Sequence, residues 1–328
     1  MPTVHGALHI AIRVDAGGTI GVGHAMRCAT LTEALIDAGH EVTVVSESLP
    51  PWIAQRYRSN GAVIDARAAG PFDVWIVDGY LLGAELTALA ETGAIVVAID
   101  DNAELPVAAA RLVVNQNLHA SRSLYPDVSE GTRLLLGPTY AMIRGDVRSI
   151  DRSGRQRGGR TVLVSFGGTD PARLTAPVTE MLLASPDVTV VVALRSDHPD
   201  HPEVQRLIES HGARASFDVG DLTDALQLAD IAAIGGGSTL WEVASLGIPA
   251  VAAVVADNQA SGTAAAEAHG FVVGVDVRTV NDGARKVADA VLALLEDLDR
   301  RDALASAGQA LFDGRGARRV VDAIEEIA

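Results

Sequence analysis

The sequence of 328 residues has a single cysteine, Cys28, few aromatic residues and no apolar run of the roughly 20 residues that a membrane-spanning helix needs. One cysteine excludes a disulfide framework and a cysteine zinc cluster, and Cys28 is expected to be a small buried residue. The N-terminus lacks the basic, apolar and small-residue regions of a secretory signal. These absences predict a cytoplasmic protein with no stable membrane insertion.

Positive charge is also scarce. The chain has 26 Lys and Arg against 42 Asp and Glu, which gives a formal net charge of −16. Broad binding to nucleic acid requires a basic surface, so no nucleic-acid partner is expected. Any anionic ligand would have to be held by local backbone dipoles and a few arginines.

Short apolar runs alternate with longer amphipathic stretches along most of the chain. Near-continuous Val and Ile runs indicate strands of a parallel sheet that is covered by helices on both faces, as in doubly wound Rossmann-like α/β domains. In the first half the expected strands are Leu8–Val14, Glu41–Ser46, Val74–Val77, Ile95–Ile99 and Arg111–Val114, and the expected helices are His24–Ala38, Trp52–Ser59 and Gly83–Glu91.

A polar segment, Arg148–Arg160, interrupts this pattern and is interpreted as an interdomain linker. The length also favours two domains, at about 150 residues each. We expect an N-terminal domain at 1–150 and a C-terminal domain at 160–328 with terminal helices, the two facing a ligand cleft. The second-half strands are expected at Thr161–Ser165, Val188–Ala193, Ile231–Ile234, Ala250–Val255 and Phe271–Val275, and the helices at Ala172–Ala184, Glu203–Ser210, Leu222–Ala229, Ser238–Leu246, Gln259–His269 and within Val280–Ala328.

A glycine-containing turn joins the first strand, Leu8–Val14, to the first helix. Gly21 and Gly23 allow a ligand to approach the backbone, and the helix start offers unpaired N–H groups to negative charge. His24 in this turn is a candidate general base. Arg27, about one helical turn further on, is a candidate catalytic residue that could orient a carboxylate or stabilise negative charge. The alternative is a glycine turn with an exposed polar residue.

A second glycine turn follows strand Ile231–Ile234 and begins a helix. Its spacing matches neither the dinucleotide fingerprint nor the P-loop, but consecutive glycines before a Ser N-cap form an anion site suited to a diphosphate. One turn into the helix, a carboxylate is placed to accept bonds from ribose hydroxyls. The candidate residues are Gly236, Gly237, Ser238, Thr239 and Glu242. The alternative is a plain glycine turn with a solvated glutamate.

Two further motifs of the second half have both a binding and a capping interpretation. Gly167 and Gly168 precede Thr169, Asp170 and Pro171, and the turn either faces ligand phosphates or caps the next helix. Asn258 and Gln259 offer amide hydrogen bonds to a sugar or phosphate, unless Asn258 is simply the next helix cap. The histidines of this half show no metal-ligand spacing; they are His198, His201, His211 and His269.

Polar residues end several strands of the first half, on the edge of the sheet expected to carry His24. Asp78 and Tyr80 follow one strand, the pair Asp100 and Asp101 the next, and Asn115 the one after. Paired carboxylates bind Mg²⁺ or divide into acid and base roles, and the alternative is that they cap turns.

Taken together, these motifs resemble one family over nearly the whole chain. They are Arg13-Val-Asp-Ala, Ile20-Gly-Val-Gly-His-Ala-Met-Arg27, Val77-Asp-Gly-Tyr80, Asp100-Asp101, Asn115-Gln-Asn117, Leu136-Gly-Pro-Thr-Tyr140, Arg144, Ser165-Phe-Gly-Gly-Thr-Asp170, Gly236-Gly-Ser-Thr-Leu-Trp-Glu242, Gly247-Ile-Pro249 and Asn258-Gln259. The chain resembles the UDP-sugar hydrolase of pseudaminic acid biosynthesis, a family similar to the GT-B glycosyltransferases.

The resemblance implies a GT-B fold and inverting hydrolysis of a UDP-activated deoxy-amino sugar, UDP-2,4-diacetamido-2,4,6-trideoxy-β-L-altropyranose in the family, without metal or cofactor. It implies that His24 activates water, that the segment Gly236–Glu242 holds diphosphate and ribose, and that Tyr80 flanks the sugar. Asn258 and Gln259 would contact the diphosphate or sugar. The alternatives are a GT-B glycosyltransferase that uses the same UDP-sugar with an acceptor, and a binding module without catalysis.

Overall fold

The structure is a computed structural model that describes residues 6–17, 22–68, 70–155, 158–167, 170–211, 215–218 (backbone only) and 222–328. The chain forms two compact units. Unit 1 comprises Met1–Gly145 and Gly314–Ala328, and unit 2 comprises Asp146–Asp313. The two units are described separately below.

Unit 1 is built on a seven-stranded parallel sheet with the strand order β3-β2-β1-β4-β5-β6-β7. The strands are β1 His9–Val14, β2 Glu41–Val45, β3 Val63–Ile64, β4 Val74–Asp78, β5 Ile95–Ile99, β6 Leu112–Asn115 and β7 Arg133–Leu136. The register aligns Val14 with Asp78 and Asp78 with Ile99. The carboxyl ends of these strands therefore lie together at one edge, where an open α/β sheet binds ligands.

Alternate residues of the unit 1 strands pack into two different cores. Ile10 and Ile12 point into a core formed with α1, α2 and α12, whereas Ala11 belongs to a core on the other face with α3. The helices are α1 Gly23–Asp37, α2 Pro51–Ser59, α3 Gly83–Ala90, the short α4 Gly145–Arg148 at the unit boundary, and α12 Gly316–Glu325. This double coverage explains the continuous apolar runs of the sequence.

Unit 2 has a six-stranded parallel sheet with the order β10-β9-β8-β11-β12-β13. The strands are β8 Thr161–Ser165, β9 Thr189–Ala193, β10 Ala215–Asp218, β11 Ile231–Gly235, β12 Ala250–Val254 and β13 Val272–Asp276. The helices are α5 Thr175–Leu183, α6 His201–His211, α7 Leu222–Leu228, α8 Thr239–Ser245, α9 Asp257–Ala268, α10 Gly283–Glu296 and α11 Leu298–Leu311. Within the part of the chain described, no helix has both the length and the apolar character needed to cross a bilayer.

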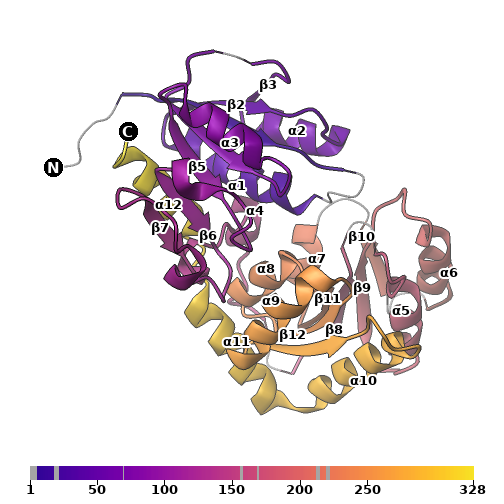
Figure 1. The fold of residues 1–328 in the computed structure, drawn as a ribbon. Helices are drawn as coiled ribbons and strands as arrows, with labels where there is room; N and C mark the ends of the chain where they lie inside the picture. Colours follow the sequence, from indigo (N-terminus) through magenta and orange to yellow (C-terminus); the bar gives the residue numbers. More distant parts are fainter. Residues whose placement is uncertain are drawn as a thin grey trace. The chain divides into compact units, whose positions relative to one another are not determined.

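The C-terminus departs from the domain division expected from sequence. The last helix, α12, was assigned to the second domain, but it packs beside α1 in unit 1 (Figure 1). Val320, Val321 and Ile324 are fully buried there. An amphipathic pattern shows that a helix has a buried face but not which core that face covers, so the sequence could not assign α12.

The segment interpreted as a linker also differs from expectation. The whole of Arg148–Arg160 belongs to unit 2, which runs from Asp146 to Asp313. The Arg152 guanidinium donates to the carbonyl oxygens of Leu226 and Ala229, each at 2.7 Å. The described part of this segment is therefore attached to unit 2 by arginine side chains, although it contributes few apolar residues.

Candidate active site

His24 lies in the first turn of α1, and its imidazole is buried against the end of β4. Its Nδ1 atom is 2.6 Å from Oδ1 of Asp78, the last residue of that strand. A carboxylate only accepts hydrogen bonds, so this short contact calls for a proton on Nδ1, although Nη2 of Arg27, which only donates, lies 2.9 Å from the same nitrogen. In that tautomer Nε2 is unprotonated, which is the arrangement that a general base needs.

Arg27 connects this pair to a second carboxylate. Its Nε and Nη2 donate to the two oxygens of Asp78, each at 2.6 Å, and its Nη1 donates to both oxygens of Asp101 at 2.7 and 2.8 Å. Burial alone would raise the pKa of Asp78, but the charge of Arg27 and the hydrogen bonds from Arg27 and His24 outweigh it and hold that pKa well below its usual range. Asp78 is therefore negatively charged at neutral pH and lies against Nδ1 of His24.

Tyr80 and Asn117 complete the cluster. The Tyr80 ring meets the His24 ring edge-on, with centroids 4.6 Å apart, and its hydroxyl lies 3.5 Å from Asp101. Burial and the neighbouring Asp101 raise the pKa of Tyr80 to about 12, so the phenol stays protonated at neutral pH. The Asn117 amide donates to Oδ1 of Asp101 at 2.8 Å. The sequence places Asp101 in a carboxylate pair with Asp100 and Asn117 in a strand-end motif with Asn115. It does not predict that Asp101 and Asn117 bond to each other or that Arg27 binds Asp101.

Asp100 and Asn115, which the sequence predicts to bind substrate, are more deeply buried than a side chain in direct contact with a substrate would be. Asn115 is completely buried, and its amide donates to the Asp101 carbonyl and to the Tyr125 hydroxyl. Asp100 is 2% exposed and accepts a bond from the Glu104 amide, while burial raises its pKa. Both residues shape the strand end from inside. The Asp101 carboxylate is bound by Arg27, and so it does not form the expected magnesium-binding pair with Asp100.

The N-terminus of α1 is open. Val22 holds the N-cap position without a side-chain capping bond, and the first turn has no acidic residue. Gly23 is exposed, and a Cβ added there would meet nothing within 4 Å. Gly21 lies outside the described residues. In the described part, the helix start thus leaves its N–H groups to solvent or to an anion.

In unit 2 the glycine turn after β11 has one crowded glycine and one open one. A Cβ at Gly236 would lie 2.4 Å from Oγ1 of Thr263, whereas Gly237 is exposed with nothing near it. Ser238 is at the N-cap of α8, but its side chain makes no capping bond, contrary to the expected cap. Because α8 has only seven residues, the backbone of the turn matters more here than a helix dipole.

Four other residues surround or follow this turn. Thr239 is half-buried at the start of α8, and Glu242 lies in the first turn of the same helix with 8% of its surface exposed. Asn258 is exposed in the first turn of α9 and is not its cap, since Ala256 holds that position. Gln259 accepts a bond from the Val255 amide at 3.0 Å.

Thr263, one turn beyond Gln259 on α9, was not selected from the sequence. Its hydroxyl is buried and has no hydrogen-bond partner among the described residues. The same hydroxyl lies where a side chain at Gly236 would be. The i, i+4 spacing from Gln259 is the signal that could have identified it.

The turn after β8 is explained mainly by capping. The carboxylate of Asp170 accepts bonds from the amides of Leu174 and Thr175 at 3.1 and 2.8 Å, so it caps α5, which begins three residues later than expected, after Pro171. Gly167 has φ +88°, a conformation that favours glycine, and is exposed. Gly168 and Thr169 lie outside the described residues.

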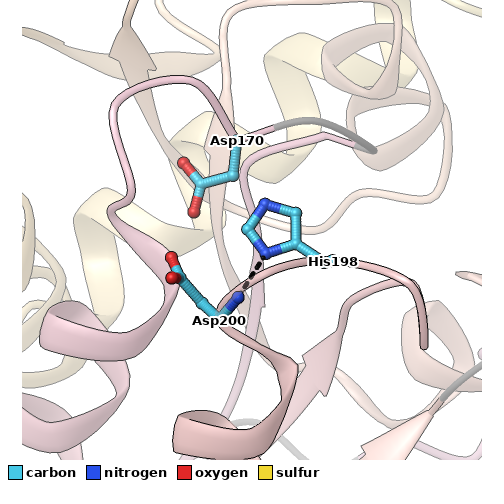
Figure 2. A group of neighbouring side chains, drawn as sticks. All are labelled: Asp170, His198 and Asp200. Carbon is cyan, nitrogen blue, oxygen red and sulfur yellow. Dashed lines mark hydrogen bonds between the residues drawn. The ribbon is translucent and has the colours of Figure 1, made fainter.

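Asp170 also lies beside His198 and Asp200, a group that spacing in the sequence did not reveal (Figure 2). All three are buried, and one ligand atom from each falls within 4.8 Å of the others. However, Arg173 pairs with Asp200, Asp170 caps α5, and His198 Nδ1 accepts from the Asp200 amide at 3.1 Å. The contacts of these residues therefore explain the group as an anchor for the start of α5.

A curated protein is similar to this chain over nearly its full length. No protein-family model matches the chain. SpsG of Bacillus subtilis (strain 168), a spore coat polysaccharide biosynthesis protein, is 22% identical over 344 residues, which cover 98% of each chain. This similarity is too low to assign the chain to a family.

Solved structures are similar over both units. MurG of Acinetobacter baumannii has a TM-score of 0.66 at 15% identity, with 97% of this chain and 99% of MurG covered. The UDP co-structure of S. aureus MnaA has a TM-score of 0.68 at 13% identity, with coverage of 97% and 96%. These likenesses confirm the expected fold: the chain is a GT-B type protein with two Rossmann-like α/β domains.

Proposed function

We propose that this chain cleaves the anomeric bond of a UDP-activated sugar, with His24 as the general base that activates the attacking O–H group. The observation that carries the proposal is the 2.6 Å contact between His24 Nδ1 and Asp78. Asp78 holds the ring in the tautomer whose Nε2 accepts a proton, and the carboxylate stabilises the imidazolium that forms. UDP is a good leaving group, so one base with stabilisation of the diphosphate suffices.

The Gly236–Glu242 turn is proposed to bind the UDP group. Gly237 and Ser238 are exposed and give a diphosphate access to backbone N–H groups, and the Ser238 hydroxyl is not used for capping. Glu242 would accept hydrogen bonds from ribose hydroxyls, and Asn258 and Gln259 would contact diphosphate or sugar. The UDP co-structure of MnaA, similar in fold, supports a nucleotide ligand of this kind.

The attacking O–H group has two candidate sources. A sugar or lipid acceptor would make the protein a glycosyltransferase, and the comparisons favour this alternative, because solved glycosyltransferases share the fold. Water would make it an inverting hydrolase that releases UDP and free sugar, as the sequence resemblance implies. Hydrolysis and transfer would use His24 in the same way. The sequence resemblance implies that the sugar is a deoxy-amino sugar.

A panel of UDP-, GDP-, CMP- and dTDP-sugars tests the proposal. Each is incubated with the chain, with and without EDTA and with and without acceptor sugars, and nucleoside diphosphate release is measured alongside the anomeric product by NMR. We expect the chain to release UDP from UDP-sugars, and we expect this release to continue in the presence of EDTA. Release without acceptor identifies hydrolysis, and acceptor-dependent release identifies transfer. The base assignment is wrong if His24→Asn releases UDP at the wild-type rate.

A further inference from the structure

Unit 2 has a polar pocket of about 280 Å³ at the amino-terminal edge of its sheet. Its walls come from residues just before β11 and β12, from the segment that precedes β8, and from α11. The glycine turn after β11 lies at the opposite, carboxyl-terminal end of that strand. The pocket is thus separate from the proposed nucleotide site.

Three arginines line this pocket in a chain that is otherwise strongly acidic. Arg152, Arg155 and Arg301 line it together with two carboxylates, Asp230 and Asp302, so the lining has an excess of one positive charge. Asp230 is already occupied, because it accepts from the Thr161 amide at 2.9 Å and pairs with Arg155. Asp302 is exposed to solvent, which screens its charge.

The guanidinium of Arg301 is not fully satisfied. Arg301 is only 6% exposed, and its Nη2 donates to the Gly159 carbonyl at 2.9 Å. Its buried Nη1 has no hydrogen-bond partner among the residues described, and the same holds for Nε of Arg155. A buried cationic donor without a partner is costly unless a ligand or water supplies the acceptor.

We propose that this pocket binds a small tetrahedral oxyanion of the phosphate class, with Arg301 as its main ligand and Arg155 beside it. A phosphate offers acceptor oxygens for the unpartnered guanidinium donors and neutralises the excess positive charge. Burial lowers the pKa of Arg301, and burial together with the charge of Arg155 lowers the pKa of Arg152 to about 10, which agrees with the unpartnered guanidinium donors. This site does not depend on the proposed enzymatic function.

Isothermal titration of inorganic phosphate into the full chain, at ionic strength matched with chloride, tests the proposal. Ala305 lines the same pocket one turn after Arg301 on α11, so the Ala305→Glu variant places a carboxylate within reach of Arg301. We expect one phosphate per wild-type chain. Ala305→Glu should weaken this binding by about tenfold or more, because a charged hydrogen bond is lost, and the uncharged Ala305→Gln should retain it.

Two further titrations separate the pocket from other anion sites. Saturating UDP should leave phosphate binding intact, and Arg285→Gln, which removes an exposed positive charge on α10, should leave it unchanged. Arg301→Gln should lose it, with folding checked by circular dichroism. The proposal is overturned if wild type takes up no phosphate at millimolar concentration, if UDP displaces it, or if Ala305→Glu binds as tightly as Ala305→Gln.

Discussion

The arrangement around His24 depends on one carboxylate, Asp78, that is completely buried. It contacts His24, Arg27 and Cys28, so a single side chain sets the ring's tautomer and anchors the neighbouring guanidinium. The sequence allowed Asp78 to be placed near His24, because both lie where parallel strands end. It could not show that Arg27 would bridge Asp78 to Asp101, since that depends on side-chain directions across two strands.

Replacing Asp78 with Asn should reduce kcat by about 100-fold or more, since general-base catalysis contributes about 10² to 10⁴. An Asn amide can donate to Nδ1 and so leave the proton on Nε2, where it blocks the base. UDP release kinetics measure the effect. Cys28→Ala is the matched control, because it removes another contact to Asp78 without touching His24 and should leave kcat nearly unchanged. Equal losses in both variants would show that the effect is structural.

Tyr80 should not titrate in the working range of the enzyme. Its pKa, raised to about 12 by burial and by Asp101, keeps the phenol neutral from mildly acidic to mildly alkaline pH. The pH profiles of kcat/KM for wild type and Tyr80→Phe should therefore share the same alkaline limb, whatever the change in rate. An alkaline limb that disappears in the Phe variant would assign that ionisation to Tyr80.

Asp101 should contribute to stability only above the acid range. Burial raises its pKa, but Arg27 outweighs burial and lowers it below the ordinary value of 3.8. A lowered folded-state pKa gives a contribution that is complete above the unfolded pKa and is lost as the pH falls through the folded one. Urea titrations measure the unfolding free energies of wild type and Asp101→Asn. The difference between the two values should be the same at pH 7 and pH 5 and should shrink as the pH falls below about 4. A difference that grows in acid would contradict this.

At the scale of elements, long Val and Ile runs were predictable and short or irregular strands were not. The strands β3, β7 and β10 have two, four and four residues and were missed. They lie at the sheet edges, where one strand partner is enough and the pattern is weak. The sequence predicts that α5 begins at Ala172, but it begins at Thr175. Asp170 has a positive φ and bonds to the Thr175 amide five residues later, so the turn between them is longer than a simple cap requires.

The glycine turn after β11 offers a matched pair of substitutions. Gly236→Ala should destabilise the protein by about 1–3 kcal/mol through overpacking and weaken UDP binding, because its Cβ would lie 2.4 Å from the Thr263 hydroxyl. Gly237→Ala should cost much less, since nothing lies near its Cβ. Thermal unfolding and UDP titration measure both effects. Adding Thr263→Ala should restore much of the stability lost in Gly236→Ala, and no rescue would refute the steric explanation.

At the scale of the whole molecule, the fold class could be predicted and the domain membership of the C-terminus could not. The order of strands and helices leads directly to two parallel sheets, which the structure contains. Membership of α12 depends on a contact between segments nearly 300 residues apart, such as that between His40 and Glu325, which lie 3.2 Å apart. Local patterns do not encode a pairing of that kind.

A fragment of residues 146–313 should fold alone, whereas residues 1–145 should not fold without 314–328. The α12 residues Val320, Val321 and Ile324 fill the unit 1 core, and truncating one large buried aliphatic side chain typically costs about 2–5 kcal/mol. Circular dichroism and amide NMR of the fragments provide the measurement. Adding a 314–328 peptide should restore dispersed spectra to residues 1–145. A cooperatively folded 1–145 fragment would disprove the dependence.

The split of unit 1 between the two ends of the chain also affects how the protein is made. A ribosome synthesises the His24 side of the molecule first, yet the helix that completes its core emerges only after the whole of unit 2. The apolar surface of nascent unit 1 that α12 covers therefore stays exposed while unit 2 is synthesised and folds. A stop codon in the last fifteen residues would spare the Gly236 turn but leave the His24 unit without its final helix.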